Sequence, residues 1–247
     1  MVRAENAEGI ARIALDRPEK KNAFTAEMYR SLGAALAAAD ADSGVRVVLL
    51  RGTRECFSSG NDVADFLKRT PGSESPAAAL FRTLPVVKKP IVAAVAGPAV
   101  GIGCTLLLHC DLIYAADNAR FQLPFVPLGL VPEFGSTLLL PLLAGYQRAA
   151  ELLLLGQPFN AERAREAGIV NEVVPVAELF ERAERAARAL ASLPPESVRL
   201  TKRLLRQTHD VALEARIAEE ARLFAERLGS AEAKAAFSAF LDKRKGG

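Results

Sequence analysis

One carboxylate stands alone in an apolar stretch near the middle of the chain. In the thirteen residues FVPLGLVPEFGST, residues 125–137, Glu133 carries the only charge. An apolar environment raises the pKa of a carboxyl group, which suits it to take and return a proton near neutral pH. A structural alternative is that Glu133 begins a helix and interacts with the positive end of the helix dipole. This stretch alone leaves both interpretations open.

Two glycine-containing segments could present backbone N–H groups to an anion. The first, CFSSGNDV at residues 56–63, follows a strand-like run and contains a tight turn. The second, AVAGPAVGIGCTLLLHCD at residues 94–111, passes through Gly101 and Gly103 into a helix-like run. Glycine allows close approach of the backbone, and N–H groups at a helix start attract negative charge. The glycines form neither a Walker motif nor a G-x-G-x-x-G pattern, and the first segment alone is equally compatible with an Asx turn.

An alternation of strand-like and helix-like runs would position these segments. Hydrophobic periodicity predicts strands at 10–16, 45–52, 90–97, 112–117, 119–124 and 169–175. It predicts helices at 25–40, with Thr25 as the N-cap, and at 103–111 and 161–168, the last ending at Gly168. After Pro175 it predicts four further helices, at 176–192, 195–208, 211–228 and 231–243. This order indicates an α/β core followed by a helical C-terminal region.

Composition and charge limit the classes of function. Half of the 247 residues are hydrophobic, the net charge is +3, and basic residues alternate with acidic ones, which argues against nucleic-acid binding. No apolar run approaches the ~20 residues of a membrane span, and the N-terminal residues resemble neither a secretory signal nor a transit peptide. We therefore expect a soluble, cytoplasmic protein without nucleic-acid or membrane partners. Three cysteines lack paired or metal-ligand spacing and are expected to be small buried side chains: Cys56, Cys104 and Cys110.

Together, the two glycine-containing segments resemble the paired oxyanion-hole segments of the enoyl-CoA hydratase/isomerase, or crotonase, superfamily. LDRPEKKNAF at residues 15–24 is similar to that family's CoA-contacting turn, and FNAERAREAGIVNEVVP at residues 159–175 to its helix–strand segment. These motifs follow the family order over almost the whole chain. The resemblance implies an α/β fold built as a crotonase-like spiral of ββα units over residues 1–190. It also implies that a helical C-terminal region, residues 191–247, assembles a homotrimer or a hexamer.

The resemblance further implies an acyl-CoA thioester substrate and no separate cofactor, because coenzyme A is part of that substrate. The thioester oxygen would lie between the backbone N–H groups of Asn61 and Ile102, where removal of an α-proton creates negative charge. Other substrate contacts are expected at Lys20, Ser58, Ser59, Gly60, Asp62, Gly101, Gly103, Phe240 and Lys243. The last two match a family F-x-x-K pattern that contacts CoA from a neighbouring subunit. A solvated Lys20–Lys21 pair and a turn-fixing Asp62 are the structural alternatives.

The chain departs from the family's hydratases at both positions of the water-activating glutamates, which here hold Thr105 and Phe125. Neither side chain can deprotonate water at neutral pH. The placement of Glu133, and the sequence FSSGND, are similar to the Δ3,Δ2-enoyl-CoA isomerase branch, which uses a single carboxylate. We therefore predict an enoyl-CoA isomerase that moves a proton from C2 to C4 of a 3-enoyl-CoA. The alternatives are an enoyl-CoA hydratase, another crotonase reaction, or a catalytically silent acyl-CoA-binding protein.

The remaining polar candidates receive structural interpretations. His109 lies inside an apolar helix and is expected to be a satisfied core histidine, while Asp111 is expected to cap that helix or form its final turn. His209 lies between two helices and is expected to be exposed. Residues 68–79 are rich in proline, glycine and small polar side chains and are predicted to form a loop that could act as a lid. No G-x-S-x-G sequence supports a serine hydrolase.

Overall fold

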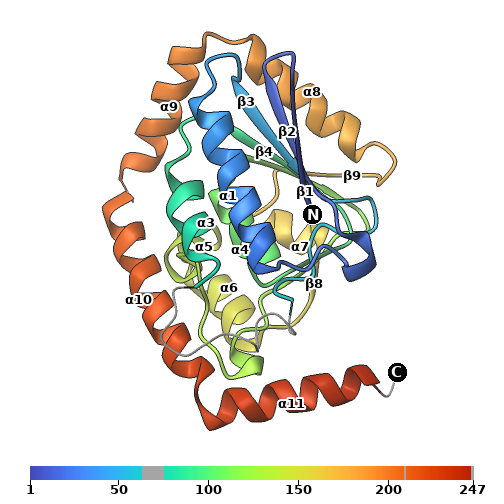
Figure 1. The fold of residues 1–247 in the computed structure, drawn as a ribbon, viewed down its shortest axis with the longest axis vertical. Coiled ribbons are helices and arrows are strands. Elements are labelled where there is room, and N and C mark those ends of the chain that lie inside the picture. Colours follow the sequence, from blue (N-terminus) through green and yellow to red (C-terminus); the bar gives the residue numbers. More distant parts are fainter. Residues whose placement is uncertain (63–74, 209, 246–247) are drawn as a thin grey trace.

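Two β-sheets form the centre of the structure, and helices cover both faces of the larger sheet (Figure 1). The computed structural model describes residues 1–62, 75–208 and 210–245, with side chains up to Ala239. The strands are β1 (Val2–Ala7), β2 (Ile10–Leu15), β3 (Val47–Arg51), β4 (Ile91–Val95), β5 (Pro98–Val100), β6 (Leu112–Ala116), β7 (Arg120–Gln122), β8 (Phe159–Asn160) and β9 (Glu172–Val174). The larger sheet has the order β1-β2-β3-β4-β6-β9 and the smaller one β5-β7-β8.

Ten α-helices lie within the described residues, together with several tighter or wider turns. They are α1 (Ala26–Ala41), α3 (Ala78–Thr83), α4 (Ile102–Thr105), α5 (Ser136–Ala144), α6 (Tyr146–Ala150), α7 (Ala161–Glu166), α8 (Leu179–Ser192), α9 (Pro195–Gln207), α10 (Asp210–Leu228) and α11 (Ala231–Lys245). The 3₁₀ turns are η1 (Pro18–Lys20), η2 (Leu84–Val86), η3 (Leu106–His109) and η4 (Val126–Leu128), and η5 (Glu151–Leu155) is a π-helical turn.

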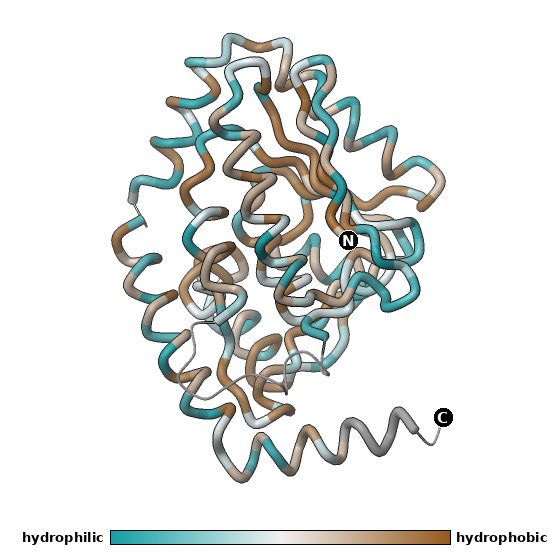
Figure 2. Tube along the Cα trace, in the orientation of Figure 1, coloured by the Kyte–Doolittle hydropathy of each residue, from teal (hydrophilic) through white to brown (hydrophobic). Residues whose placement is uncertain are grey.

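The larger sheet separates two apolar layers. Strands β2, β3, β4, β6 and β9 pair in parallel, and β1 joins the edge of β2 antiparallel. Because parallel strands are covered on both faces, β3 and β4 read as continuous hydrophobic runs. Alternate side chains such as Val48 and Leu50 join the layer beneath α1 and α3, whereas Val47 and Leu49 face α8. Figure 2 shows these strands as hydrophobic segments inside the molecule.

The expected α/β core and helical C-terminal region are confirmed. The hydroxyl of Thr25 accepts a hydrogen bond from the Met28 N–H at 3.2 Å, which confirms the predicted N-cap of α1. The helix predicted over 103–111 is wrong in its second half, where α4 tightens into the 3₁₀ turn η3, a common ending for a short helix. The sequence patterns do not predict strands β1, β5 and β8 or helices α3, α5 and α6. Of the predicted loop 68–79, residues 68–74 lie outside the described residues, and α3 begins at Ala78.

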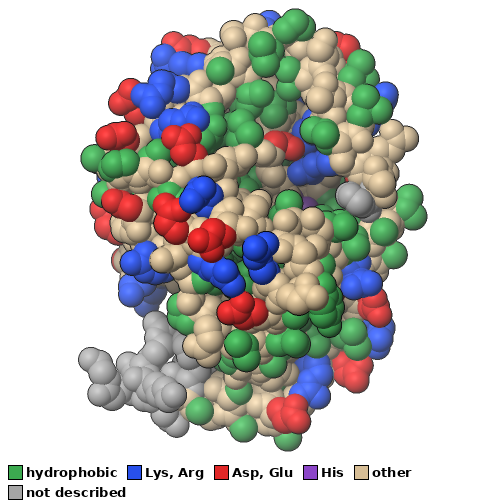
Figure 3. Space-filling view, turned by 180° about the vertical axis from the view of Figure 1, so that it is seen from behind, with side chains coloured by type: hydrophobic (Ala, Val, Ile, Leu, Met, Phe, Trp, Pro, Cys, Tyr) green, Lys and Arg blue, Asp and Glu red, His purple; other side chains and the backbone are tan. Residues whose placement is uncertain are grey.

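The surface intermixes charges of both signs. On the face opposite the view of Figure 1, acidic and basic side chains alternate with hydrophobic ones (Figure 3), matching the alternation in the sequence. Within the described ranges, no helix combines the length and the apolarity needed to cross a bilayer.

Candidate active site

The two glycine-containing segments lie side by side. Ser58 forms a parallel bridge with Ala99, and the Val100 N–H donates to the Ser58 carbonyl at 2.9 Å. A Cβ atom on Gly60 would lie 2.9 Å from the Val100 carbonyl oxygen, and one on Gly103 would lie 2.8 Å from the Ser58 carbonyl oxygen. Side chains at these two glycines would therefore push the segments apart.

In each segment, the N–H group expected to bind the thioester oxygen has no backbone partner. The bridge between Phe24 and the first segment uses the N–H of Asp62, so the N–H of Asn61 points to the opposite side. In the second segment, Gly101 adopts φ +55°, and Ile102 is the first residue of α4, where an N–H has no helical acceptor. No described residue accepts a hydrogen bond from the N–H of Asn61 or of Ile102. The expected donor pair thus lies on neighbouring backbone segments.

Glu133 lies in a tight turn on the wall of a large pocket. Its side chain is 6% exposed, and the pocket, about 1080 Å³ in volume, is also lined by Asn61. The next two residues, Phe134 and Gly135, adopt left-handed backbone angles, φ +61° and +72°. A positive φ is rare for a bulky side chain such as phenylalanine and needs support from its surroundings. Helix α5 begins only at Ser136, so Glu133 lies outside its first turn.

The carboxylate that holds the start of α5 is Glu220 of α10, which the sequence had not singled out. Its Oε2 accepts from the Gly135 N–H at 2.5 Å, and its Oε1 accepts from the N–H and the hydroxyl of Thr137 at 3.0 and 2.6 Å. Burial raises the pKa of Glu220, and these hydrogen bonds partly oppose that rise. The helix-start role considered for Glu133 therefore belongs to Glu220, which interacts with the N-terminal end of the helix dipole.

Phe134, beside Glu133, is clamped by two aromatic rings. Its ring stacks on Phe81 with centroids 4.1 Å apart and on His109 at 4.0 Å. His109 Nε2 lies 2.8 Å from the Phe134 carbonyl oxygen. Burial lowers the pKa of His109 to about 3, so the neutral imidazole donates through Nε2–H. The expected core histidine is confirmed, and its partner is the residue next to the candidate acid.

The turn that carries Asn61 is fixed by side chains on both sides. The Tyr29 hydroxyl donates to Asn61 Oδ1 at 2.7 Å, and Arg17 Nη1 donates to Asp62 Oδ2 at 2.7 Å. This geometry agrees with the turn-fixing interpretation of Asp62. Ser58 is fully buried, and its hydroxyl donates to the Asn22 carbonyl at 2.9 Å. That position favours a structural role for Ser58 over the expected substrate contact.

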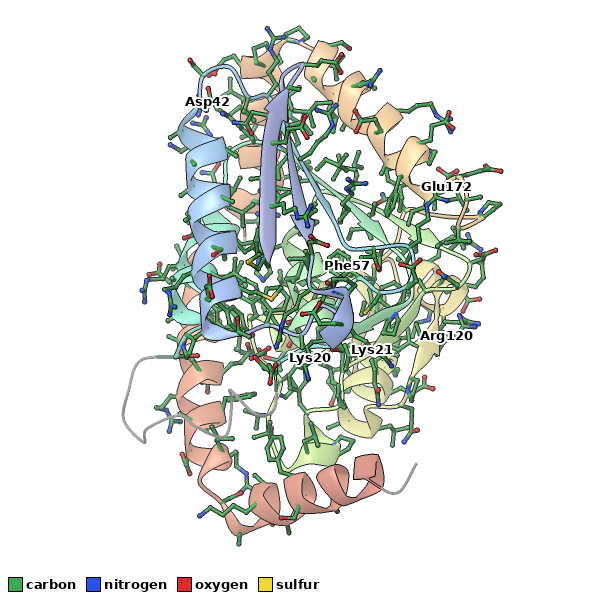
Figure 4. All side chains as sticks on the ribbon, turned by 45° about the vertical axis from the view of Figure 1, so that its right-hand side comes forward. Lys20, Lys21, Asp42, Phe57, Arg120 and Glu172 are labelled. Atoms are coloured by element: carbon green, nitrogen blue, oxygen red, sulfur yellow. The ribbon has the colours of Figure 1, made fainter. Side chains whose placement is uncertain are left out.

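Lys20 and Lys21 lie on and just after η1, beside the same turn. Both are exposed, and the Ser59 N–H donates to the Lys21 carbonyl at 2.9 Å. Figure 4 shows the two lysines near one end of α1. The side chains of Phe240 and Lys243 lie outside the described residues, as does His209.

The two positions that the family resemblance assigns to water-activating glutamates are buried and carry no carboxylate. Phe125 packs edge-on to Phe224, with ring centroids 6.5 Å apart. The Thr105 hydroxyl is fully buried and has no hydrogen-bond partner among the described residues. Cys56 and Cys104 are buried and Cys110 is half-buried, which agrees with the expected packing role, and burial raises the pKa of the Cys56 thiol to about 11. In the described part of the chain, no group of three His, Cys, Asp or Glu side chains could hold a metal ion.

Asp111 does more than end a helix. Its Oδ2 accepts from the Ile91 N–H at 2.7 Å and from Lys202 Nζ at 2.7 Å. The cap or turn role expected for Asp111 is therefore incomplete, because this carboxylate also links Lys202 of α9 to Ile91, the first residue of β4.

Comparisons with known proteins all find enoyl-CoA hydratases or isomerases. Residues 5–246 match the family model described as enoyl-CoA hydratase/isomerase. Enoyl-CoA delta isomerase 2 of Rattus norvegicus is 37% identical over 243 residues, covering 96% of this chain and 62% of that protein. The 2,3-dehydroadipyl-CoA hydratase of Escherichia coli is 34% identical over 236 residues, covering 94% and 92%. The crystal structure of an enoyl-CoA hydratase/isomerase from Pseudoalteromonas atlantica T6c has a TM-score of 0.94 at 38% identity, covering 98% of this chain and 97% of that one.

Proposed function

The chain belongs to the enoyl-CoA hydratase/isomerase family, and we propose that it is an isomerase that shifts the double bond of a 3-enoyl-CoA to the 2-position. The observation that carries this proposal is Glu133, a buried carboxylate that shares a pocket wall with Asn61. Both positions of the hydratase glutamates hold residues that cannot act as bases, Thr105 and Phe125. A proton shuttle needs only one carboxylate, and Glu133 is the buried carboxylate that lines this pocket.

In the proposed mechanism, the thioester oxygen accepts hydrogen bonds from the N–H groups of Asn61 and Ile102. Glu133 takes a proton from C2, and the electron pair moves onto the thioester oxygen to give a dienolate. Each preorganised donor stabilises such a charge by roughly 3–4 kcal/mol. Glu133 then returns the proton at C4, which leaves the double bond between C2 and C3. The reaction consumes no water and needs no separate cofactor.

The contacts around Glu133 support this role. One carboxyl group must reach C2 and then C4, so its backbone has to stay fixed while the side chain moves between the two carbons. Glu220 holds the N–H groups of Gly135 and Thr137, and His109 holds the Phe134 carbonyl. Three of the four residues after Glu133 are therefore anchored by side chains from other elements: Phe134, Gly135 and Thr137.

Hydration of a 2-enoyl-CoA is the second candidate. The name of the Escherichia coli relative favours it. The buried Thr105 hydroxyl also favours it, because such a group could hold a water molecule. Since Thr105 cannot deprotonate that water, hydration would have to use Glu133 as its base.

The decisive experiment measures both activities on wild type and on Glu133→Gln. The amide preserves shape but cannot accept the C2 proton, so isomerisation should fall in kcat by about 10⁴-fold, the upper end of general acid–base effects, or more. The Kd for a CoA thioester should stay nearly unchanged, and wild type should hydrate 2-enoyl-CoA slowly at best. Fast hydration by wild type would favour the second candidate. Continued isomerisation by a folded Gln variant would remove Glu133 from the mechanism.

We also propose that residues 191–247 mediate assembly into trimers or dimers of trimers. The supporting observation is that Leu204 and Leu205 of α9 and Val211 of α10 are 63%, 74% and 85% exposed in the single chain. Side chains of this kind commonly mark interaction surfaces when they lie together. Light scattering should show an oligomer at micromolar concentration, and a stable monomer there would contradict the proposal.

A further inference from the structure

The pocket that contains Glu133 extends along most of helix α1. At one end it is lined by Ala26 and Tyr29, in the first turns of α1. At the other end it is lined by Lys88. The backbone N–H of Lys88 donates to Oδ1 of Asp40, a residue in the last turn of α1, at 2.9 Å. A helix rises ~1.5 Å per residue, so Tyr29 and Asp40 lie about 16 Å apart along the axis. Figure 4 shows Lys20 and Lys21 near one end of α1 and Asp42 at the other.

The pocket changes in character from one end to the other. Glu133, Asn61 and Tyr29 line the part of the pocket where the thioester is proposed to lie. Between that part and α9, apolar side chains line the pocket from α3, the segment after it, and the start of α10: Phe81, Val87 and Leu213. The far end is lined by basic side chains: Lys88, Lys202, Arg203 and Arg206. An acyl chain that followed the apolar walls would therefore end among cations.

Two of these four cations are fixed by protein groups. Lys202 is 6% exposed, and its Nζ donates to Asp111 Oδ2 and to the Lys89 carbonyl, each at 2.7 Å. Arg206 donates to the Pro85 carbonyl at 3.2 Å and to the His109 carbonyl. These contacts hold α9 against the far end of the pocket.

The other two cations, Lys88 and Arg203, are exposed at the pocket wall. Neither side chain forms a hydrogen bond or an ion pair with any residue of the described ranges. Asp210 and Glu214 of α10 also line the pocket, but neither lies within ion-pair distance of Lys88 or Arg203. The far end thus keeps two cations that are available to a ligand.

We propose that the far end of the pocket binds an anionic group at the end of the acyl chain, so that the substrate class is a dicarboxylic acyl-CoA. The free carboxylate would meet Lys88 and Arg203, while the CoA phosphates lie at the opposite end of α1, beside Lys20. A methyl-ended chain would leave these cations without a partner, whereas a carboxylate forms charge-assisted hydrogen bonds with them. This inference rests on the proposed function, because it takes the thioester to lie at Asn61 and Ile102.

The dimensions set an expected chain length. An extended chain advances ~3.3–3.6 Å for every three bonds, so 16 Å corresponds to about 14 bonds. Because lysine and arginine side chains reach into the pocket, roughly 10 to 14 bonds should separate the thioester carbon from the terminal carboxylate.

The test uses equilibrium binding of saturated CoA thioesters, which requires no turnover. Pairs of equal length, about 12 to 14 carbons, carry either a terminal methyl or a terminal carboxylate, and titration calorimetry gives Kd for each. Wild type should bind the carboxylate-ended ligand about tenfold more tightly or better, and added salt should reduce this preference. Arg203→Ala should remove most of the preference, and Lys88→Ala part of it. Arg222→Ala is the matched control, because Arg222 lines the same pocket but pairs with Glu226 at 3.3 Å.

Two results would overturn the inference. Equal Kd values for both ligands in wild type would show that the far end does not recognise a carboxylate. An equal loss for both ligands in Arg203→Ala and Lys88→Ala would assign these cations to the CoA phosphates. Failure of the proposed isomerase activity would leave the binding preference intact, so the two proposals fail separately.

Discussion

The two halves of the candidate site are built in different ways. The donor pair consists of backbone N–H groups. The two segments that carry it are joined by backbone hydrogen bonds, and Gly60 and Gly103 each let one segment lie close to the backbone of the other. The turn of Glu133 is instead held by side chains that are distant in the sequence. Glu220 is 85 residues from its partner Gly135, and His109 is 25 residues from its partner Phe134. The first half should therefore tolerate substitutions at Ile102 that keep its N–H, but no side chain at its two glycines. The second should depend on the identity of residues that never touch the substrate.

Apart from Glu133→Gln, the largest effect should come from removing a donor in the backbone-built half. Ile102→Pro deletes one N–H at the first position of α4, where proline is otherwise tolerated. We expect kcat for isomerisation to fall about 10²–10³-fold with a smaller change in KM. Ile102→Val keeps the N–H and should retain activity within a few-fold. A folded proline variant with wild-type turnover would show that this N–H does not contact the thioester oxygen.

A smaller effect should come from the anchor of the carboxylate turn. Glu220→Ala leaves the N–H groups of Gly135 and Thr137 without their acceptor, which should cost about 1–3 kcal/mol of stability. Because the turn positions Glu133, kcat should also fall, by about tenfold, in protein that remains folded at the assay temperature. Glu219→Ala is the matched control. Glu219 is the neighbour of Glu220 on α10, but its side chain is 58% exposed and forms an ion pair with Arg216 at the surface.

Chemical denaturation and steady-state kinetics separate the two parts of this prediction. If Glu220→Ala loses stability but keeps its kcat, Glu220 supports the fold without positioning Glu133. If it loses neither, the hydrogen bonds to the start of α5 contribute nothing measurable. A comparable loss in Glu219→Ala would point to a general weakening of α10.

The sequence predicts the first half of the site much better than the second. The strand and glycine patterns around Asn61 and Ile102 are local, so periodicity and turn chemistry mark both segments, and the family resemblance then assigns the two N–H groups. Glu133 stands out because it is charged in an apolar stretch. Glu220 does not, because it lies in the run AEEAR, which looks like a solvated helix face. Its role depends on the docking of α10, which no local pattern encodes.

Two further features that the sequence does not predict, the backbone of Phe134 and strand β1, have similar causes. The left-handed backbone of Phe134 has no sequence signature, because a bulky aromatic disfavours that conformation and only its packing against Phe81 and His109 maintains it. Strand β1 reads VRAENA, with four exposed residues, so it lacks the apolar alternation of a half-buried strand. It forms because β2 offers it an edge, with six residue pairs in register from Val2–Leu15 to Ala7–Ile10. In each case a tertiary contact overrides a weak or opposing local preference.

The last prediction uses pH to separate the two halves, since backbone N–H groups do not titrate in this range but His109 does. Its pKa is about 3 in the folded protein because of burial, against an ordinary value of 6.5. Between these values the unfolded chain binds a proton and the folded protein does not, so stability is lost as pH falls below about 6.5. At pH 5 the loss should be about 2 kcal/mol. His109→Gln retains an N–H donor for the Phe134 carbonyl but cannot titrate. Urea unfolding at pH 8 and pH 5 should therefore show that the variant loses about 2 kcal/mol less stability than wild type between these two pH values. Equal losses in the two proteins would mean that His109 is not held neutral beside Phe134, and that the turn of Glu133 lacks the pH-sensitive support described here.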